Sequence, residues 1–290
     1  MNISKKNFLQ NSKELSVSNY HIILKKMLLN EDNQEIINFI RDLHAADIAE
    51  IIQKLDEENR SKFIISIKDF FNPEILTYLN EGIKDEIIEN LDLKKLATTV
   101  SELDTDDAVD LVEDLDKSEQ EVLLSYVSAS NRKLIEEGLN YPEDSAGRLM
   151  QRTFVAIDNS WNVGNTIDYL RKEKQNLPDD FYDVYLINSD NNVTGIVPLG
   201  RLMSSDRTVE LNNIQNTKTR LINVLTDQEE VAYQFNKYAM VSAPVTDDTD
   251  KLIGSITVDD VVDVIEEERE EDILKLGGVG QADIFEAIIG

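Results

Sequence analysis

The chain has 290 residues, enough for two or three domains, and carries 57 acidic residues against 29 lysines and arginines. The formal net charge of −28 argues against nucleic acid or an anionic membrane surface as a direct partner and favours cations or basic proteins. There is no cysteine, and the two histidines, His21 and His44, are far apart in the sequence. We therefore expect neither disulfides nor a zinc centre, and any bound metal should be an oxygen-ligated ion such as Mg²⁺, Ca²⁺ or Mn²⁺.

Residues 1–19 are polar, and we expect them to form a flexible N-terminus. They contain no apolar run long enough for a signal peptide. The chain also has no stretch of about 18 apolar residues, the length that a membrane-spanning helix requires. The sequence as it stands therefore predicts no transmembrane segment.

The region from 20 to 140 has a helical pattern with an aliphatic residue at every twelfth position. These residues are Leu43, Leu55, Ile67, Leu79, Leu91, Leu103, Leu115, Val127 and Leu139. Twelve residues fit one short helix and a tight turn, and Asp92 and Asp104 stand where N-caps are expected. Stacked short helices of this kind predict a superhelical, solenoid-like domain, with an irregular helical bundle as the alternative.

An acidic cluster without any lysine or arginine lies in this region. It consists of Glu102, Asp104, Asp106, Asp107, Asp110, Glu113, Asp114 and Asp116. Asp106, Asp110 and Asp114 follow one another at i,i+4 spacing, which predicts that they share one helix face. Such a face is typical of solvated surface when it stands alone, whereas a second acidic face would indicate an interface bridged by cations.

Beyond residue 140 the pattern changes to alternating strands and helices, and Pro142 and Gly147 mark the boundary. We predict strands at 154–157, 183–187, 193–197, 220–224, 242–246 and 252–256, and helices at 163–174, 199–205, 228–238 and from 258 onward. Gly195 and Gly254 take matching places 59 residues apart. The order of elements predicts a tandem βαββα repeat.

The stretch from Ser255 to Gly278 predicts a strand that leads into an acidic helix. Thr257 can cap this helix, and Asp259 and Asp260 stand in its first turn, where the helix dipole favours acids. Further acids follow: Asp263, Glu266, Glu267, Glu268, Glu270, Glu271 and Asp272. Asp260, Asp263, Glu267 and Glu271 lie on roughly one face, and acids late in a helix oppose its dipole. This pattern favours a divalent-cation site, with a solvated acidic helix as the alternative.

Several segments together resemble a known family. The second repeat, P-V-T-D-D-T-D-K-L-I-G-S-I-T-V-D-D-V-V-D-V-I (Pro244–Ile265), resembles a CBS domain. The junction Y-P-E-D-S-A-G-R-L-M (Tyr141–Met150) and the acidic exit helix, together with the helical repeat before them, resemble the cytosolic region of the MgtE family of magnesium transporters and channels. The resemblance covers nearly the whole chain from about residue 20.

This resemblance implies an α+β multidomain protein: an all-α superhelical domain, a tandem pair of βαββα CBS domains and the start of a connecting helix. We place the flexible N-terminus at 1–19, the helical N domain at 20–140, the CBS domains at 141–205 and 206–270, and the start of the connecting, or plug, helix at 271–290. In the family a membrane pore domain follows. The expected setting is therefore the cytoplasmic face of the cell membrane, with the chain's own pore domain and a second copy, bound through the CBS domains, as partners.

The family regulates its pore by Mg²⁺ bound between acidic faces of the N domain, the CBS pair and the connecting helix. The positions that match here are Asp106, Asp110, Asp260, Asp263, Glu268, Glu271 and Asp272, with Glu266 and Glu267 as further candidates. CBS pairs also bind adenine nucleotides, and Thr257 and Asp260 have the spacing that holds the ribose of ATP. The first repeat has Pro198 and Arg201 at the equivalent positions, which argues against a nucleotide there.

Three kinds of function therefore compete: a Mg²⁺-sensing gate of a transporter, an adenine-nucleotide-sensing CBS module, and a helical-repeat scaffold for a basic protein partner. We favour the first because the acids continue past Asp260 along the exit helix. We do not expect an enzyme, since no glycine-rich phosphate loop and no Cys–His or Ser–His arrangement is recognisable.

Overall fold

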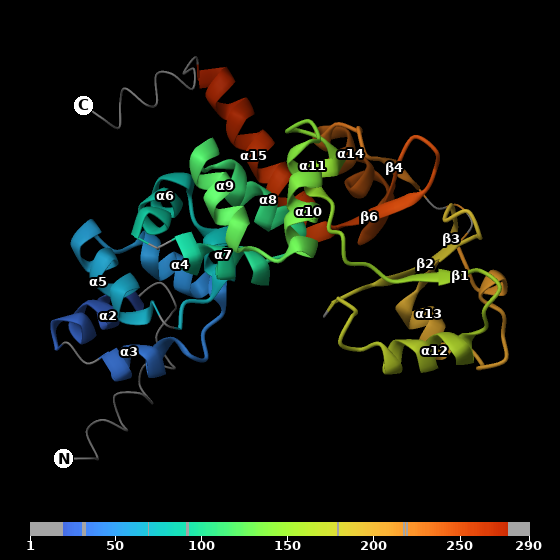
Figure 1. Ribbon diagram of the computed structural model, residues 1–290, viewed down its shortest axis with the longest axis horizontal. Coiled ribbons are helices and arrows are strands. Elements are labelled where there is room, and N and C mark those ends of the chain that lie inside the picture. The colour runs from blue at the N-terminus through green and yellow to red at the C-terminus, as the bar shows by residue number, and fades with distance from the viewer. Residues whose placement is uncertain are drawn as a thin grey trace. The chain divides into compact units, whose positions relative to one another are not determined.

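The computed structural model describes residues 20–30, 33–68, 70–90, 93–178, 180–216, 218 and 220–277 (Figure 1). By its contacts the chain divides into two compact units, each built from two segments. Unit 1 consists of Met1–Leu103 and Asp114–Ser128, and unit 2 of Asp104–Glu113 and Ala129–Gly290. The predicted flexibility of residues 1–19 and the predicted N-cap at Asp92 lie outside the described residues.

Unit 1 is helical throughout its described part. Its elements are α2 (Tyr20–Leu29), α3 (Asn33–Ile40), α4 (Ala45–Gln53), α5 (Glu57–Ile67), the 3₁₀ helix η2 (Pro73–Tyr78), α6 (Glu81–Asn90), α7 (Leu93–Glu102) and α9 (Lys117–Tyr126). Helices α4, α5, α6, α7 and α9 begin at positions that differ by twelve or multiples of twelve, as do α8 (Thr105–Glu113) and α10 (Ala129–Leu139) of unit 2. The predicted helix-and-turn period is therefore confirmed.

The period has one irregularity, at η2. A regular helix would begin near residue 69, but proline is tolerated only in the first turn of a helix, because it lacks an N–H and clashes with the preceding turn. The element accordingly begins at Pro73, and the side chain of Asn72 caps it by accepting a hydrogen bond from the Glu74 backbone N–H at 3.1 Å. Proline thus replaces one α-helix of the series by a shorter 3₁₀ helix.

Unit 2 contains two three-stranded sheets of the same topology. The first comprises β1 (Ala156–Asp158), β2 (Asp183–Ile187) and β3 (Val193–Pro198), and the second β4 (Ile222–Asn223), β5 (Ser242–Thr246) and β6 (Leu252–Thr257). In each, the first strand pairs in parallel with the second, which forms an antiparallel hairpin with the third. The pairings Leu186↔Gly195 and Val245↔Gly254 are equivalent. The predicted tandem repeat is confirmed.

The helices of unit 2 are α8 (Thr105–Glu113), α10 (Ala129–Leu139), α11 (Ala146–Leu149), α12 (Val163–Lys172), α13 (Leu199–Ser204), α14 (Gln228–Tyr238) and α15 (Val258–Gly277), with a 3₁₀ turn, η3, at Leu211–Asn213. Helix α15 is continuous, so the last CBS helix and the beginning of the predicted connecting helix form one helix as far as Gly277. The predicted boundaries of the helical N domain and of the two CBS domains stay predictions.

The core of the second sheet joins elements from three parts of the chain. Phe235 of α14 and Ile256 of β6 pack there with Met150, which follows α11, and with Val261 and Val264 of α15. Burial of these apolar side chains fixes α11 and α15 on the same sheet. The acidic first turn of α15 is therefore held by a packed core rather than by a loop.

Candidate functional site

Helix α8 is positioned by its apolar side. Ala108, Val109, Leu111 and Val112 are buried, and α8 packs against α10. The two helices approach closely at Gly138, where an added Cβ would lie 2.4 Å from Val109 Cγ2. The helix begins with a hydrogen bond from Ala108 N–H to the Asp104 carbonyl, and Asp106 and Asp107 stand in its first turn, where the helix dipole favours acids.

Asp106 and Asp260 bring the first turns of α8 and α15 together within unit 2. Asp106 is only 7 % exposed, and its side chain is hydrogen bonded to that of Asp260. Its Oδ1 is buried without a hydrogen-bond partner among the described residues. Asp260 Oδ2 in turn accepts hydrogen bonds from the Thr257 backbone N–H at 3.0 Å and the Thr257 hydroxyl at 2.9 Å. The sequence predicted both acids, and the structure places them in contact.

The electrostatics of this group are unusual for aspartates. Burial, with repulsion from Asp260, raises the pKa of Asp106 well above its usual range. Burial, again with repulsion from Asp260, raises the pKa of Asp107 to about 7. Burial also raises the pKa of Asp260 to about 6, although the hydrogen bonds from Thr257 oppose this rise. The fold therefore favours the protonated forms of these carboxyls, and a cation that replaced the protons would relieve the repulsion.

The other predicted ligands take different places. Asp110 and Asp263 are exposed, and both add to the repulsion that raises the pKa of Asp107. Glu268 is half-buried and accepts a long hydrogen bond of 3.4 Å from Gln228 Nε2 on α14. The backbone of Glu266, Glu267, Glu271 and Asp272 is helical, but their side chains lie outside the described residues.

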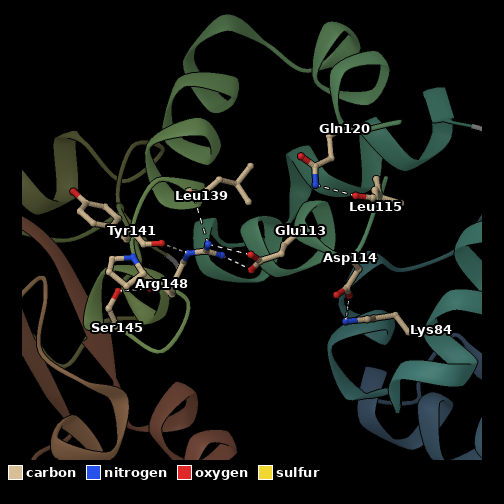
Figure 2. Close-up of polar contacts among 10 residues, drawn as sticks. Lys84, Glu113, Asp114, Leu115, Gln120, Leu139, Tyr141, Ser145 and Arg148 are labelled. Atoms are coloured by element: carbon tan, nitrogen blue, oxygen red, sulfur yellow. Dashed lines mark hydrogen bonds and ion pairs between the residues drawn. The ribbon is translucent and has the colours of Figure 1, made fainter. Parts of the chain in front are cut away.

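The prediction that Asp114 shares a helix face with Asp106 and Asp110 is wrong. Helix α8 ends at Glu113, because the twelve-residue period places a turn there, so Asp114 does not continue the face of Asp106 and Asp110. Its carboxylate pairs instead with Lys84 in unit 1 at 2.5 Å (Figure 2). Asp107 was not among the predicted ligands, although its place beside Asp106 and three residues from Asp104 and Asp110 could have indicated it.

The described donors fit an oxygen-seeking cation in part. Carboxylate oxygens suit Mg²⁺, Ca²⁺ and Mn²⁺, and the unpartnered Oδ1 of Asp106 is such a donor. Within the described residues, however, no group of three or more acidic or histidine side chains is arranged to hold a metal ion. A cation here would use one or two carboxylates and complete its shell with water, as Mg²⁺ commonly does.

Two cavities lie beside the strands of unit 2. Thr257 lines one of about 20 Å³, together with Tyr185 and Ser255, and its hydroxyl is already engaged with Asp260. A larger cleft of about 690 Å³ lies beside Pro198, the equivalent of Thr257 in the first repeat. It is lined by Lys218 and by Arg220, whose guanidinium carbon lies 4.2 Å from the centre of the Tyr238 ring. The cleft large enough for a nucleotide therefore lies at the first repeat, where the sequence argued against a nucleotide site.

None of the helices in the described part of the chain is long and apolar enough to cross a bilayer.

Comparison with known proteins matches residues 43–144 to the MgtE intracellular N domain and residues 218–267 to the CBS domain. The chain is 26% identical over 269 residues to the magnesium transporter MgtE of Bacillus subtilis and 28% identical over 266 residues to that of Thermus thermophilus. Each alignment covers 91% of this chain and 59% of the relative, so the chain spans little more than half of their length.

Two solved structures are also similar over most of the chain. The soluble part of a magnesium transporter is 28% identical, with a TM-score of 0.75, over 87% of this chain and 99% of that one. The cytosolic domain of the Mg²⁺ channel MgtE in complex with ATP is 25% identical, with a TM-score of 0.77, over 84% and 99%. With matches to the MgtE intracellular N domain and to a CBS domain, and with this fold, the chain is similar over most of its length to the cytosolic domain of MgtE proteins.

Proposed function

We propose that the chain is the Mg²⁺-sensing regulatory region of a magnesium transporter or channel. In this proposal Mg²⁺ binds between the acidic first turns of α8 and α15, and its binding closes a membrane pore that belongs to the same protein. The region acts at the cytoplasmic face of the membrane and performs no catalysis. Ca²⁺ or Mn²⁺ could take the place of Mg²⁺, since all three prefer oxygen ligands.

The contact between Asp106 and Asp260 is the observation that carries this proposal. Two carboxyl groups meet in a largely buried place, one of their oxygens has no partner among the described residues, and neither forms an ion pair with a described lysine or arginine. Such an arrangement is unfavourable when both groups are ionised. A divalent cation would neutralise the repulsion and satisfy the unpartnered oxygen, which makes the association of α8 with α15 dependent on the ion.

Several weak ions would be needed for a complete switch. An ion at ten times its dissociation constant stabilises the state that binds it by about 1.4 kcal/mol. Moving a two-state equilibrium from 1:99 to 99:1 requires about 5.5 kcal/mol, so on the order of four such ions would suffice. The remaining acids of α8 and α15, Asp107, Asp110 and Asp263 among them, could supply these further sites.

The first test compares the purified chain in millimolar Mg²⁺ with the same chain in sodium chloride of equal ionic strength plus a chelator. Thermal unfolding and limited proteolysis report whether the ion stabilises it. We expect a higher melting temperature and slower cleavage in Mg²⁺, beyond what ionic strength gives. Identical unfolding and cleavage in the two solutions would rule out the proposed sensor.

A second candidate function is supported by the larger cleft. We propose that it binds ATP, because its volume suits a nucleotide and Lys218 and Arg220 provide positive charge for phosphates in an otherwise very acidic chain. The likeness to an MgtE cytosolic domain in complex with ATP supports this. Calorimetric titration with ATP should show binding that Lys218→Ala and Arg220→Ala weaken at least about tenfold. Arg207→Ala, which removes an arginine paired with Asp168 at 2.7 Å, is the matched control.

The alternative nucleotide site is the one at Thr257, and the same titration can distinguish it from the larger cleft. If Thr257→Val abolishes ATP binding while the cleft variants leave it intact, the nucleotide lies on the Thr257 side, as the sequence predicted.

We also propose that the chain forms a homodimer through its CBS domains. Sedimentation at several protein concentrations in Mg²⁺ should show a dimer, and a monomer at every concentration would exclude it.

A further inference from the structure

The larger cleft beside Pro198 contains a single carboxylate among the described residues that line it, that of Asp183. Lys218 and Arg220, which line the same cleft, are exposed. Asp183 is half-buried at the start of β2, and Ser242 beside it is buried. The cleft is therefore basic where it is open to solvent and acidic where it is covered. A ligand that carries only negative charge would be repelled by the covered end.

Asp183 and Ser242 are equivalent residues of the two repeats. Each is the first residue of the second strand in its sheet, β2 or β5, and they lie 59 residues apart, as Gly195 and Gly254 do. The Ser242 hydroxyl donates to Asp183 Oδ2 at 2.7 Å, so the two repeats meet at this pair. A hydrogen bond to an ionised acceptor is short and directional, and this one fixes the orientation of the carboxylate at the wall of the cleft.

A chain of buried hydroxyls determines which way this bond runs. Since Ser242 gives its proton to the carboxylate, it accepts from the Tyr185 hydroxyl, at 3.1 Å. Tyr185 in turn accepts from the Ser255 hydroxyl at 2.5 Å. Every proton in the chain points toward Asp183, so its carboxylate is the acceptor in which the chain ends. Burial raises the pKa of Asp183, and the hydrogen bond from Ser242 opposes this rise.

The second oxygen of Asp183 is available for a ligand. None of the described residues donates a hydrogen bond to this oxygen, Oδ1. Arg201 takes the place in the first repeat that Asp260 takes in the second. Its Nη1 donates to the Ile214 carbonyl and to Asn216 Oδ1, both at 2.9 Å, and a guanidinium offers no acceptor. A ligand in this cleft would therefore find its carboxylate acceptor at Asp183.

We propose that Asp183 determines the specificity of the larger cleft. Its carboxylate accepts a hydrogen bond from the nucleoside part of the ligand and repels anions that lack such a donor. The phosphates lie at Lys218 and Arg220, and the donor is a ribose hydroxyl or the amino group of the base. Ser242 is a positioning residue, because it acts through Asp183. The inference rests on the proposed binding of ATP in this cleft.

Calorimetric titrations of the full chain with the sodium salts of ATP and of inorganic tripolyphosphate, both in chelator, test the proposal. Asp183→Asn keeps the shape of the side chain and removes its charge. It should weaken the binding of ATP at least about tenfold, because a hydrogen bond to an ionised acceptor is lost. It should strengthen the binding of tripolyphosphate, because the repulsion is lost as well. Asp206→Asn, which removes an exposed acid of unit 2 outside the cleft, should change neither affinity.

Ser242→Ala is the second variant, since it keeps the charge of Asp183 and removes the hydroxyl that orients it. The binding of ATP should weaken, whereas that of tripolyphosphate should stay unchanged. If both ligands bind more weakly in Asp183→Asn and in Ser242→Ala alike, the two residues only maintain the shape of the cleft, and the proposal is wrong.

Analogues of ATP identify the donor. 2′-Deoxy-ATP and 3′-deoxy-ATP each lack one ribose hydroxyl, and purine riboside triphosphate lacks the amino group of the base. The analogue without the donor should bind the unmodified chain at least about tenfold more weakly than ATP does, but should equal ATP in Asp183→Asn. If all three analogues bind the unmodified chain as ATP does, Asp183 accepts from no nucleoside group and the proposal is overturned.

The variants of the basic residues separate this inference from the function on which it rests. If Lys218→Ala and Arg220→Ala leave the affinity for ATP intact, or if the unmodified chain binds no ATP, the proposed nucleotide site fails and the inference fails with it. If these two changes weaken the binding of ATP and Asp183→Asn does not, the site stands and only the role of Asp183 is wrong.

Discussion

Asp106, Asp107 and Asp260 differ from ordinary surface aspartates because their protonated forms are favoured in the fold. In the unfolded chain they titrate near a pKa of about 4. In the folded chain the pKa of Asp107 is raised to about 7 and that of Asp260 to about 6. From about pH 4 to about pH 7 the folded state therefore binds more protons than the unfolded state. The free energy of unfolding must fall as the pH rises through this window.

This difference gives a prediction for the metal-free protein. In chelator, the melting temperature of the chain should be higher at pH 5 than at pH 7.5, and Asp106→Asn should flatten this dependence and raise the melting temperature at pH 7.5. Roughly 2–4 °C is expected, the shift that about 1 kcal/mol gives in a domain of this size. Thermal unfolding followed by circular dichroism measures both.

The control separates this effect from the general repulsion in a chain of net charge −28. Asp190→Asn with Asp206→Asn removes two exposed acids of unit 2 and should leave the slope of melting temperature against pH nearly unchanged. A melting temperature that increases from pH 5 to 7.5 in the unmodified chain would show that Asp106, Asp107 and Asp260 do not behave as described.

At the scale of the elements, the association of α8 with α10 decides where the acids of α8 lie. The period of twelve predicted that both helices exist, because twelve residues fit one short helix and a tight turn. It could not predict that α8 and α10 belong to unit 2 while α9 belongs to unit 1. That division depends on contacts between distant parts of the chain, such as Arg148 with Glu113, and local spacing carries no record of them.

Gly138 offers a test of this helix pair. In Gly138→Ala the new methyl group would lie 2.4 Å from Val109 Cγ2, so α8 must shift or Val109 must change its rotamer. We expect a loss of about 1–3 kcal/mol in the free energy of unfolding. We also expect a weaker stabilisation by Mg²⁺, because the shift displaces Asp106.

Gly200→Ala is the matched control for the glycine, since nothing lies within 4 Å of the added Cβ and the residue is helical. It should leave both the unfolding free energy and the response to Mg²⁺ close to those of the unmodified chain. Denaturant unfolding with and without Mg²⁺ provides the numbers. If Gly138→Ala proves as harmless as Gly200→Ala, the close packing of α8 on α10 does not position the acids.

At the scale of the whole molecule, the order of segments was predictable because each carries its own local signal. The hairpin turns at Asn191 and Asp250 show this well: both residues have positive φ, at 69° and 61°, which asparagine and aspartate tolerate better than most residues. The cleft beside Pro198 was not predictable, because Arg220 precedes β4 and reaches the ring of Tyr238 only through the fold, where Lys218 lines the same cleft.

The candidate cation site was predictable only in part, because some of its features have a local sequence signal and others depend on the fold. Two acidic faces can be recognised from spacing alone, but the burial of Asp106 and its hydrogen bond to Asp260 depend on residues far apart in the chain. The involvement of Asp107 and the loss of Asp114 to Lys84 follow from where α8 begins and ends. In the proposed sensor, Asp106 of α8 and Asp260 of α15 share their ions.

Calorimetric titration with Mg²⁺ of four proteins tests this most directly: the unmodified chain, Asp106→Asn, Asp260→Asn and the double variant. If the acids share ions, each single change should weaken binding at least about tenfold, or about 1.4 kcal/mol, and the double variant should be little weaker than the worse single one. Additive losses, or Mg²⁺ binding that neither single change affects, would contradict a shared site and with it the proposed sensor.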